Sequence, residues 1–108
     1  MSDLHSNPLA PVHPGEMLRA EFLEPMELSA GALARALGVP RTRIERLVKE
    51  ETRLTADTAL RLARYFGTSA EMWLGFQSRY DMEMARGDLG PALAAITPRA
   101  ASEPALRI

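Results

Sequence analysis

Hydrophobic side chains recur at intervals of three and four residues along most of this chain, which is the spacing of helices with one buried face. Five stretches show it: Met17, Leu18, Phe22 and Leu23; Leu33, Ala34 and Leu37; Ile44, Leu47 and Val48; Ala59, Leu60, Leu62, Ala63 and Phe66; and Trp73, Phe76, Tyr80 and Met84. No stretch alternates with a period of two for long enough to be a strand. The pattern therefore predicts an all-α fold of five helices.

Residues at the helix ends support this division. Ser29, Thr55 and Ser69 precede the second, fourth and fifth stretches, where a side-chain oxygen can accept a hydrogen bond from a free backbone N–H. Gly38 and Gly67 follow the second and fourth stretches, and glycine suits the left-handed residue that ends many helices.

The outer limits of the domain follow from proline and glycine. We expect the first helix to begin within residues 13–16, HPGE, and to end at Glu24 and Pro25, because proline disfavours a helical residue before it. The fifth helix should end near Arg86 and Gly87. We interpret residues 1–12 and 87–108 as a flexible N-terminal arm and a flexible C-terminal tail, with a short helix at residues 91–96 as an alternative. The domain would then span residues 13–86.

The second and third stretches form a helix-turn-helix pattern over residues 29–55. Gly38 and Val39 make the turn, and Pro40 opens the second helix of the pair. The polar positions of that helix include four basic side chains and one hydroxyl: Arg41, Thr42, Arg43, Arg46 and Lys49. Such a helix can lie in the major groove of DNA. The alternative interpretation is an ordinary corner between two helices with a solvated basic face.

Charge is unevenly distributed, and this favours DNA binding. The 108-residue chain has a net charge of −1, 46% hydrophobic residues and 25% charged residues, which is ordinary for a globular protein. Residues 35–64, however, carry eight basic and four acidic side chains, whereas residues 1–28 carry one basic and five acidic ones. Phosphate attraction depends on the local patch and not on the total.

Several other classes are not supported by the residues present. The chain has no cysteine, so disulfides and thiolate metal sites are excluded, and His5 and His13 are too few to indicate a metal centre. We find no apolar run long enough for a membrane helix and no signal peptide. Nor is there a nucleophile with a base or a glycine-rich phosphate loop. We therefore expect neither an enzyme nor a cofactor.

Three segments resemble the HigA antitoxins, also called VapI-like antidotes, within the XRE family that has the Cro/repressor fold. They are HPGEMLRAEFLEPMELSAGALARALGV at residues 13–39, LTADTALRLARYFGTSAEMWLGFQSRYD at residues 54–81, and the basic helix between them. The resemblance covers about residues 13–84. It implies a bacterial cytoplasmic protein that neutralises a HigB toxin, a RelE-like ribonuclease that cuts messenger RNA. It also implies a dimer that binds operator DNA and represses its own operon.

The resemblance also assigns site residues. The DNA-reading positions of the family fall on Pro40, Arg43 and Arg46, with Arg41 and Thr42 beside them. A helix N-terminus such as that at Ser29 can hold a phosphate. Lys49 and Arg53 are phosphate candidates, or else solvated surface.

One loop departs from the family pattern. The family usually has glycine at position 50, often with a basic neighbour, whereas this chain has Glu50 and Glu51. A left-handed residue other than glycine costs ~1 kcal/mol, and two carboxylates oppose DNA. Either the loop differs in shape or operator affinity is modest. The acidic loop therefore motivates one alternative to the antitoxin–repressor, a toxin antidote with weak DNA binding. A second alternative is an XRE regulator without a toxin that acts on other promoters.

The family places its dimer contact on the fifth helix and its flanks. Trp73, Gln77 and Tyr80 share one face of that helix, and we expect them either to form a core stripe or to contact a second copy.

Overall fold

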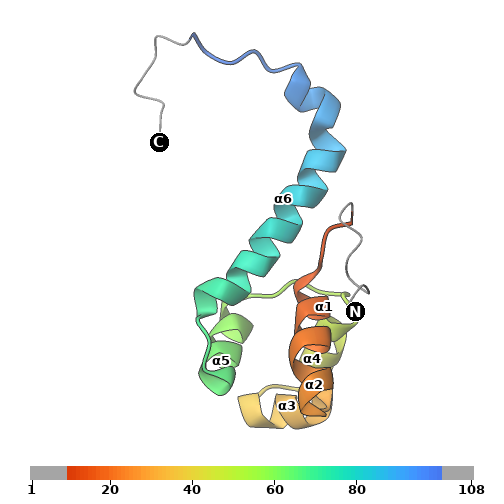
Figure 1. Ribbon diagram of the computed structural model, residues 1–108, viewed down its shortest axis with the longest axis vertical. Helices are drawn as coiled ribbons and strands as arrows, with labels where there is room; N and C mark the ends of the chain where they lie inside the picture. Colours follow the sequence, from red (N-terminus) through yellow and green to blue (C-terminus); the bar gives the residue numbers. More distant parts are fainter. Residues whose placement is uncertain (1–9, 101–108) are drawn as a thin grey trace.

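Helices account for all regular structure in residues 10–100, which are the residues that the computed structural model describes. The first helix consists of three consecutive segments, α1 (Pro14–Leu18), η2 (Arg19–Leu23) and α2 (Glu24–Met26). It is followed by α3 (Ala30–Leu37), α4 (Arg41–Val48), α5 (Ala56–Phe66) and α6 (Ala70–Ala94). Helices α1 to α5 form a compact body, from which α6 projects (Figure 1). The predicted all-α fold of five helices is confirmed for these residues.

The first helix changes its winding before Pro25. Its middle segment is a π-helix, in which the backbone N–H of Glu24 donates to the carbonyl of Arg19, five residues earlier. Proline has no N–H and crowds the carbonyl four residues before it, and a wider turn relieves that crowding. The helix therefore ends at Met26, just beyond the predicted end at Glu24 and Pro25. Glu27 then turns the chain with a left-handed φ of 52°.

The predicted caps are confirmed. Each hydroxyl accepts a hydrogen bond from the backbone N–H three residues on: Ser29 from Ala32 (3.0 Å), Thr55 from Thr58 (3.4 Å) and Ser69 from Met72 (3.0 Å). Gly38 and Gly67 are left-handed, with φ of 73° and 74°. Helix α4 begins one residue later than predicted, so Pro40 is its N-cap and not the first residue of its first turn.

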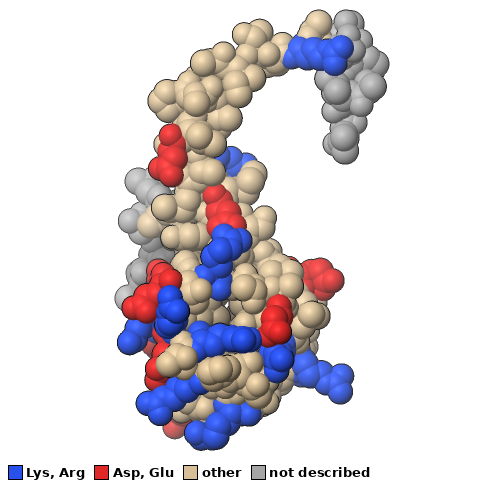
Figure 2. Space-filling view, turned by 180° about the vertical axis from the view of Figure 1, so that it is seen from behind, with Lys and Arg blue, Asp and Glu red and all other residues tan. Residues whose placement is uncertain are grey.

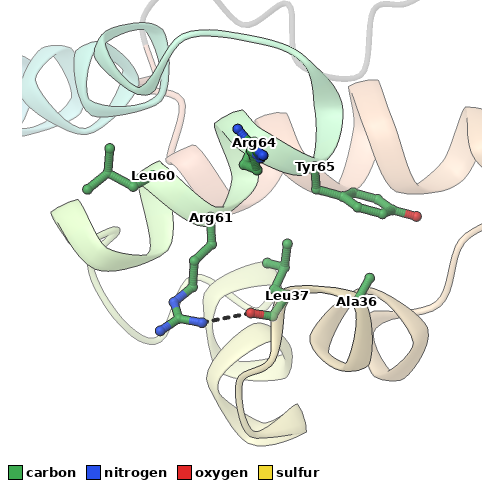
Figure 3. Close-up of a pocket in the computed structure, with 6 residues that line it drawn as sticks. All are labelled: Ala36, Leu37, Leu60, Arg61, Arg64 and Tyr65. Carbon is green, nitrogen blue, oxygen red and sulfur yellow. Dashed lines mark hydrogen bonds between the residues drawn. The ribbon is translucent and has the colours of Figure 1, made fainter.

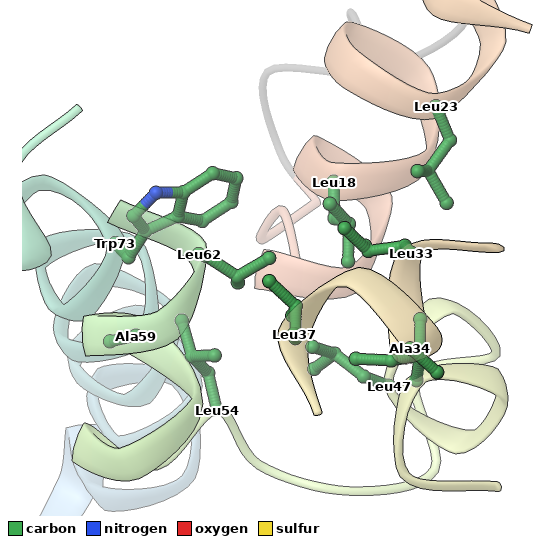
Figure 4. Close-up of a cluster of buried hydrophobic side chains, with 11 residues drawn as sticks. Leu18, Leu23, Leu33, Ala34, Leu37, Leu47, Leu54, Ala59, Leu62 and Trp73 are labelled. Carbon is green, nitrogen blue, oxygen red and sulfur yellow. The ribbon is translucent and has the colours of Figure 1, made fainter. Parts of the chain in front are cut away.

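The core draws on every helix of the body (Figure 4). Its buried members are Leu18, Leu23, Leu33, Ala34, Leu37, Ile44, Leu47, Leu54, Ala59, Leu62 and Trp73. Phe22, Phe66 and Phe76 surround the Trp73 indole at centroid distances of 4.9, 6.3 and 5.6 Å. The indole Nε1 donates to Thr68 Oγ1 at 2.8 Å, so this large side chain is buried with its polar atom satisfied.

Helix α6 is longer than predicted. It continues past Arg86 and Gly87 to Ala94, through Gly90 and Pro91, so the predicted end near residue 86 is wrong. Glycine and proline lower helix propensity without forbidding the helix, and alanine and leucine after Pro91 are strong helix formers. Of the predicted flexible segments, residues 1–9 and 101–108 lie outside the described residues. None of the helices in residues 10–100 combines the length and the hydropathy that a membrane span requires.

The start of the first helix touches α4 directly. His13 Nδ1 accepts a hydrogen bond from the Gly15 backbone N–H at 2.9 Å, which caps the helix. The His13 ring is buried and packs against the Tyr80 ring in a T-shaped arrangement, with 4.9 Å between the ring centroids. Gly15 lies so close to α4 that a Cβ built on it would be 1.8 Å from the Leu47 carbonyl oxygen. A side chain at position 15 would therefore force α1 and α4 apart.

We expect Gly15→Ala to destabilise the protein by about 1–3 kcal/mol or more, because the new methyl group must push α1 away from the α4 backbone. Urea unfolding followed by circular dichroism measures the change. Gly75→Ala is the matched control, since a Cβ there meets nothing within 4 Å. On an exposed helix position alanine should raise stability by up to ~1 kcal/mol. Equal effects of the two substitutions would contradict the close approach.

The pKa of His13 should make stability depend on pH. Burial lowers this pKa below 6.5, against the opposing effects of Glu50, a hydrogen bond to the Thr52 backbone, and Asp81. A folded-state pKa below the unfolded value favours the neutral ring, so the stabilisation is present above pH 6.5 and is lost as the pH falls below it.

The measurement is urea unfolding of the wild type and of His13→Asn between pH 8 and pH 5. Asparagine retains a capping oxygen but does not titrate. The stability difference between the two proteins should shrink as the pH falls. A difference that stays constant or grows would show that His13 does not fold as the neutral ring.

Candidate nucleic-acid interface

Helix α4 has one buried face and one exposed face. Ile44 and Leu47 are buried in the core. The side chains predicted for DNA lie on the other face and are all exposed: Arg41, Thr42, Arg43, Arg46 and Lys49. Seen from behind, basic side chains gather over the compact body, and the projecting part of α6 carries few charges (Figure 2). The sequence pattern therefore placed the buried and exposed faces of α4 correctly.

The C-terminal end of α4 is held by a residue of the first helix. Arg19 donates from Nη1 to the Val48 carbonyl, and its Nη2 pairs with Glu50 Oε2 at 3.4 Å. A cation at this end of a helix satisfies a free carbonyl and opposes the negative end of the helix dipole. Glu50 is left-handed, with φ of 63°. The loop thus has the conformation that glycine would favour, and the carboxylate of Glu50 is paired with Arg19.

Arg43 is tied to the first turn of α5. Its Nη1 donates to Asp57 Oδ1 at 2.8 Å, and Arg61 Nε donates to the same oxygen at 2.8 Å. Arg61 also donates from Nη1 to the Leu37 carbonyl at the end of α3, at 2.8 Å (Figure 3). Hydrogen bonds from Arg61 and then Arg43 lower the pKa of the Asp57 carboxyl, against desolvation. Three helices therefore share one hydrogen-bonded cluster beside the exposed face of α4.

The other basic residues differ in their partners. Arg41 Nε donates to Glu45 Oε2 at 2.7 Å, and this contact raises the pKa of Arg41. The Arg46 and Lys49 side chains form no hydrogen bond or ion pair within residues 10–100. Arg53, a phosphate candidate, forms a two-armed pair with Asp81 at 3.2 and 3.0 Å.

The start of α3 lies beside the start of α4. A Cβ built on Gly31 would be 3.4 Å from Arg41 Cδ, so the stem of Arg41 passes over the first turn of α3. Ser29 and Pro40, the N-caps of the two helices, are both exposed. The structure thus brings the predicted DNA residues of both helices onto one surface.

The residues predicted for a dimer contact lie mainly inside the subunit. Trp73 is 0% exposed and Gln77 is 3% exposed. Gln77 Oε1 accepts from the Leu54 backbone N–H at 2.7 Å, and its Nε2 donates to Asp81 at 2.9 Å, which fastens the loop before α5 to α6. Tyr80 is half-buried against His13. Of the two alternatives for this face, the core stripe holds for Trp73, which aromatic rings surround, and for Gln77, which is buried with its amide hydrogen-bonded. Neither side chain is therefore exposed to a second copy, which corrects the partner-contact alternative for these two residues, and a dimer contact elsewhere on the fifth helix stays a prediction.

The contacts of Asp57 are not apparent from the sequence. Asp57 lies in the first turn of α5, where a negative charge is favourable. The spacing of Asp57 and Arg61, four residues apart on one helix, was a signal for their ion pair. The contact with Arg43, fourteen residues earlier, was not visible because it depends on how α4 packs beside α5. Among the described residues, no group of three His, Asp or Glu side chains is placed to hold a metal ion.

Comparison with known proteins agrees with this geometry. Residues 20–73 match the family model described as helix-turn-helix. Virulence-associated protein I of Dichelobacter nodosus is 55% identical over 82 residues, 76% of each chain. Antitoxin HigA-1 of Vibrio cholerae is 44% identical over 72 residues, covering 67% of this chain and 68% of the relative.

A solved structure shares the fold as well. The Pseudomonas aeruginosa antitoxin HigA, determined with the higBA promoter, superposes with a TM-score of 0.79 and 43% identity. The match covers 83% of this chain and 99% of that one. From its helix-turn-helix, its sequence relatives and this superposition, the chain belongs to the HigA/VapI-type antitoxins of the XRE helix-turn-helix family.

Proposed function

We propose that this protein is the antitoxin of a type II toxin–antitoxin pair. In this proposal it neutralises a HigB/RelE-like toxin that cleaves messenger RNA, and it binds operator DNA as a dimer to repress its own operon. The observation that carries the DNA half is the exposed basic face of α4, which is rigidly backed by the core. The toxin half is supported by the likeness to HigA antitoxins.

Arg43 and Arg46 suit the reading of bases. They lie three residues apart and so face the same side of α4. An arginine can pair with both acceptors on the major-groove edge of guanine, and such a pair contributes ~1–3 kcal/mol of discrimination. Because α4 has only eight residues, one copy touches few base pairs. Two copies spaced by about 34 Å, one turn of DNA, would read a palindrome.

The loop after α4 favours the hypothesis of an operator-binding repressor over that of an antidote with weak DNA affinity. The carboxylate of Glu50 lies 3.4 Å from Arg19, so its charge is partly neutralised within the protein. Glu51 is exposed and does oppose phosphate, but Arg46 and Lys49 lie nearby on the chain with no ion-pair partner among the described residues. An antitoxin that kept toxin neutralisation but failed to shift its own promoter would favour the weak-binding alternative.

The double variant Arg43→Ala/Arg46→Ala should lose specific promoter binding and keep toxin neutralisation. Each lost arginine–guanine pair should cost ~1–3 kcal/mol of operator affinity. A mobility shift on the protein's own promoter and growth rescue on co-expression with the adjacent toxin gene measure the two activities.

Arg79→Ala/Arg86→Ala is the matched control, because it removes the same charge from exposed positions of α6. This control should retain most of its operator binding. Full promoter binding by the α4 variant would contradict the assignment of α4. Loss of toxin neutralisation in a folded α4 variant would contradict separate surfaces for DNA and toxin.

Operator affinity should fall steeply with salt, because basic side chains that neutralise phosphates release counterions. Each phosphate contact contributes about −0.9 to the slope of log K against log salt concentration. Lys49→Ala should make the slope shallower by about 1, and Arg86→Ala should leave it unchanged. Fluorescence anisotropy of labelled operator between 50 and 200 mM salt gives the slopes. An affinity that does not change across this range would rule out the phosphate contacts.

A further inference from the structure

Asp57, in the first turn of α5, is an acidic residue beside the proposed DNA surface of α4. Its side chain is 54% exposed and lies beside a hollow of about 270 Å³ that Arg43 and Arg53 also line. A carboxylate at such a place opposes phosphate, although its two arginine partners neutralise part of its charge.

The contacts of Asp57 indicate that role. Its Oδ1 receives Nη1 of Arg43 and Nε of Arg61, each at 2.8 Å. Arg61 is itself fixed at its far end by the Leu37 carbonyl, at 2.8 Å. Arg61 of α5, which is bonded to the end of α3, therefore holds the Asp57 carboxylate in place. The carboxylate in turn holds the Arg43 guanidinium of α4. Without it, Arg43 would be a long side chain free to adopt many rotamers.

The bond to Asp57 leaves much of Arg43 free. A guanidinium has five N–H donors, and within residues 10–100 this one uses only Nη1. The edge formed by Nε and Nη2 is available for two parallel hydrogen bonds to a base. The guanidinium is therefore oriented before DNA arrives, which reduces the entropy lost on binding.

We propose that Asp57 is a positioning residue that orients Arg43 to read a guanine edge, an inference that rests on the operator binding proposed above. It raises discrimination between operator and other DNA, and it does so at some cost to total DNA affinity. The proposal predicts changes of opposite sign in the affinities for random DNA and for the operator. Removing the charge should strengthen binding to random DNA while weakening binding to the operator.

The test compares Asp57→Asn with Glu51→Gln in the full-length protein. Both substitutions remove one negative charge near α4, but only Asp57 contacts Arg43. Fluorescence anisotropy measures affinity for the promoter duplex and for a scrambled duplex of the same length. Glu51→Gln should strengthen both and leave their ratio unchanged. Asp57→Asn should lower the ratio about tenfold, an effect within the range of one arginine–guanine pair. An unchanged ratio would overturn the proposal.

A double-mutant cycle separates positioning from a structural effect. In the Arg43→Ala background, Asp57→Asn should no longer change the ratio, because the side chain it orients is absent. A ratio that falls equally in both backgrounds would show that Asp57 acts without Arg43. Thermal melting checks the fold, and Asp57→Ser is a second variant that lacks the charge but suits a first helical turn.

The outcomes also distinguish this proposal from the function on which it rests. If the wild type fails to prefer its promoter over scrambled DNA, the proposed operator binding is wrong. If the wild type prefers its promoter, and Arg43→Ala removes that preference while Asp57→Asn does not, only the positioning role is wrong.

Discussion

The contact between the start of the first helix and the end of α4 is the constraint on which the rest of the structure depends. Gly15 lies against the Leu47 carbonyl, with no room for a side chain, and Arg19 one turn later binds the Val48 carbonyl. Both contacts are made to backbone carbonyls of α4, and the backbone of a helix is less mobile than its side chains. They fix the axis of α4, so the direction of its exposed face is set by the body.

Ion pairs fix the positions of some of the basic side chains on the exposed face of α4. Arg41 pairs with Glu45, and Arg43 pairs with Asp57, while Arg46 and Lys49 have no ion-pair partner within residues 10–100. Pairs this exposed contribute little to stability, typically below ~1 kcal/mol. Their effect is to restrict side-chain geometry on a surface that would otherwise be a set of mobile cations.

Much of the fold could be predicted from the sequence because it depends on interactions between residues close together in the chain. The caps at Ser29, Thr55 and Ser69 and the left-handed turns at Gly38 and Gly67 act within a few residues, and all five are found as predicted. The buried and exposed faces of α4 follow in the same way from helical spacing. Proline and glycine predicted helix ends less reliably, because they disfavour a helix without preventing it. The first helix extends past Pro25 by widening to a π-turn, and α6 continues through residues 87–91.

The sequence alone therefore determined the helices, their caps, the buried stripes of α3 and α4 and the likeness to HigA antitoxins, because each depends on residue type and spacing along one segment. The predicted stripes of α5 and α6 are correct only in part, since Leu60 and Met84 are exposed. Only the tertiary structure decided what the exposed residues do to one another. The packing of α5 beside α4 brings Asp57 to Arg43, and the enclosing aromatic rings place Trp73 inside the subunit and not at a partner. Such contacts join residues far apart in the chain, so they depend on how helices pack and leave no periodic signal in the sequence.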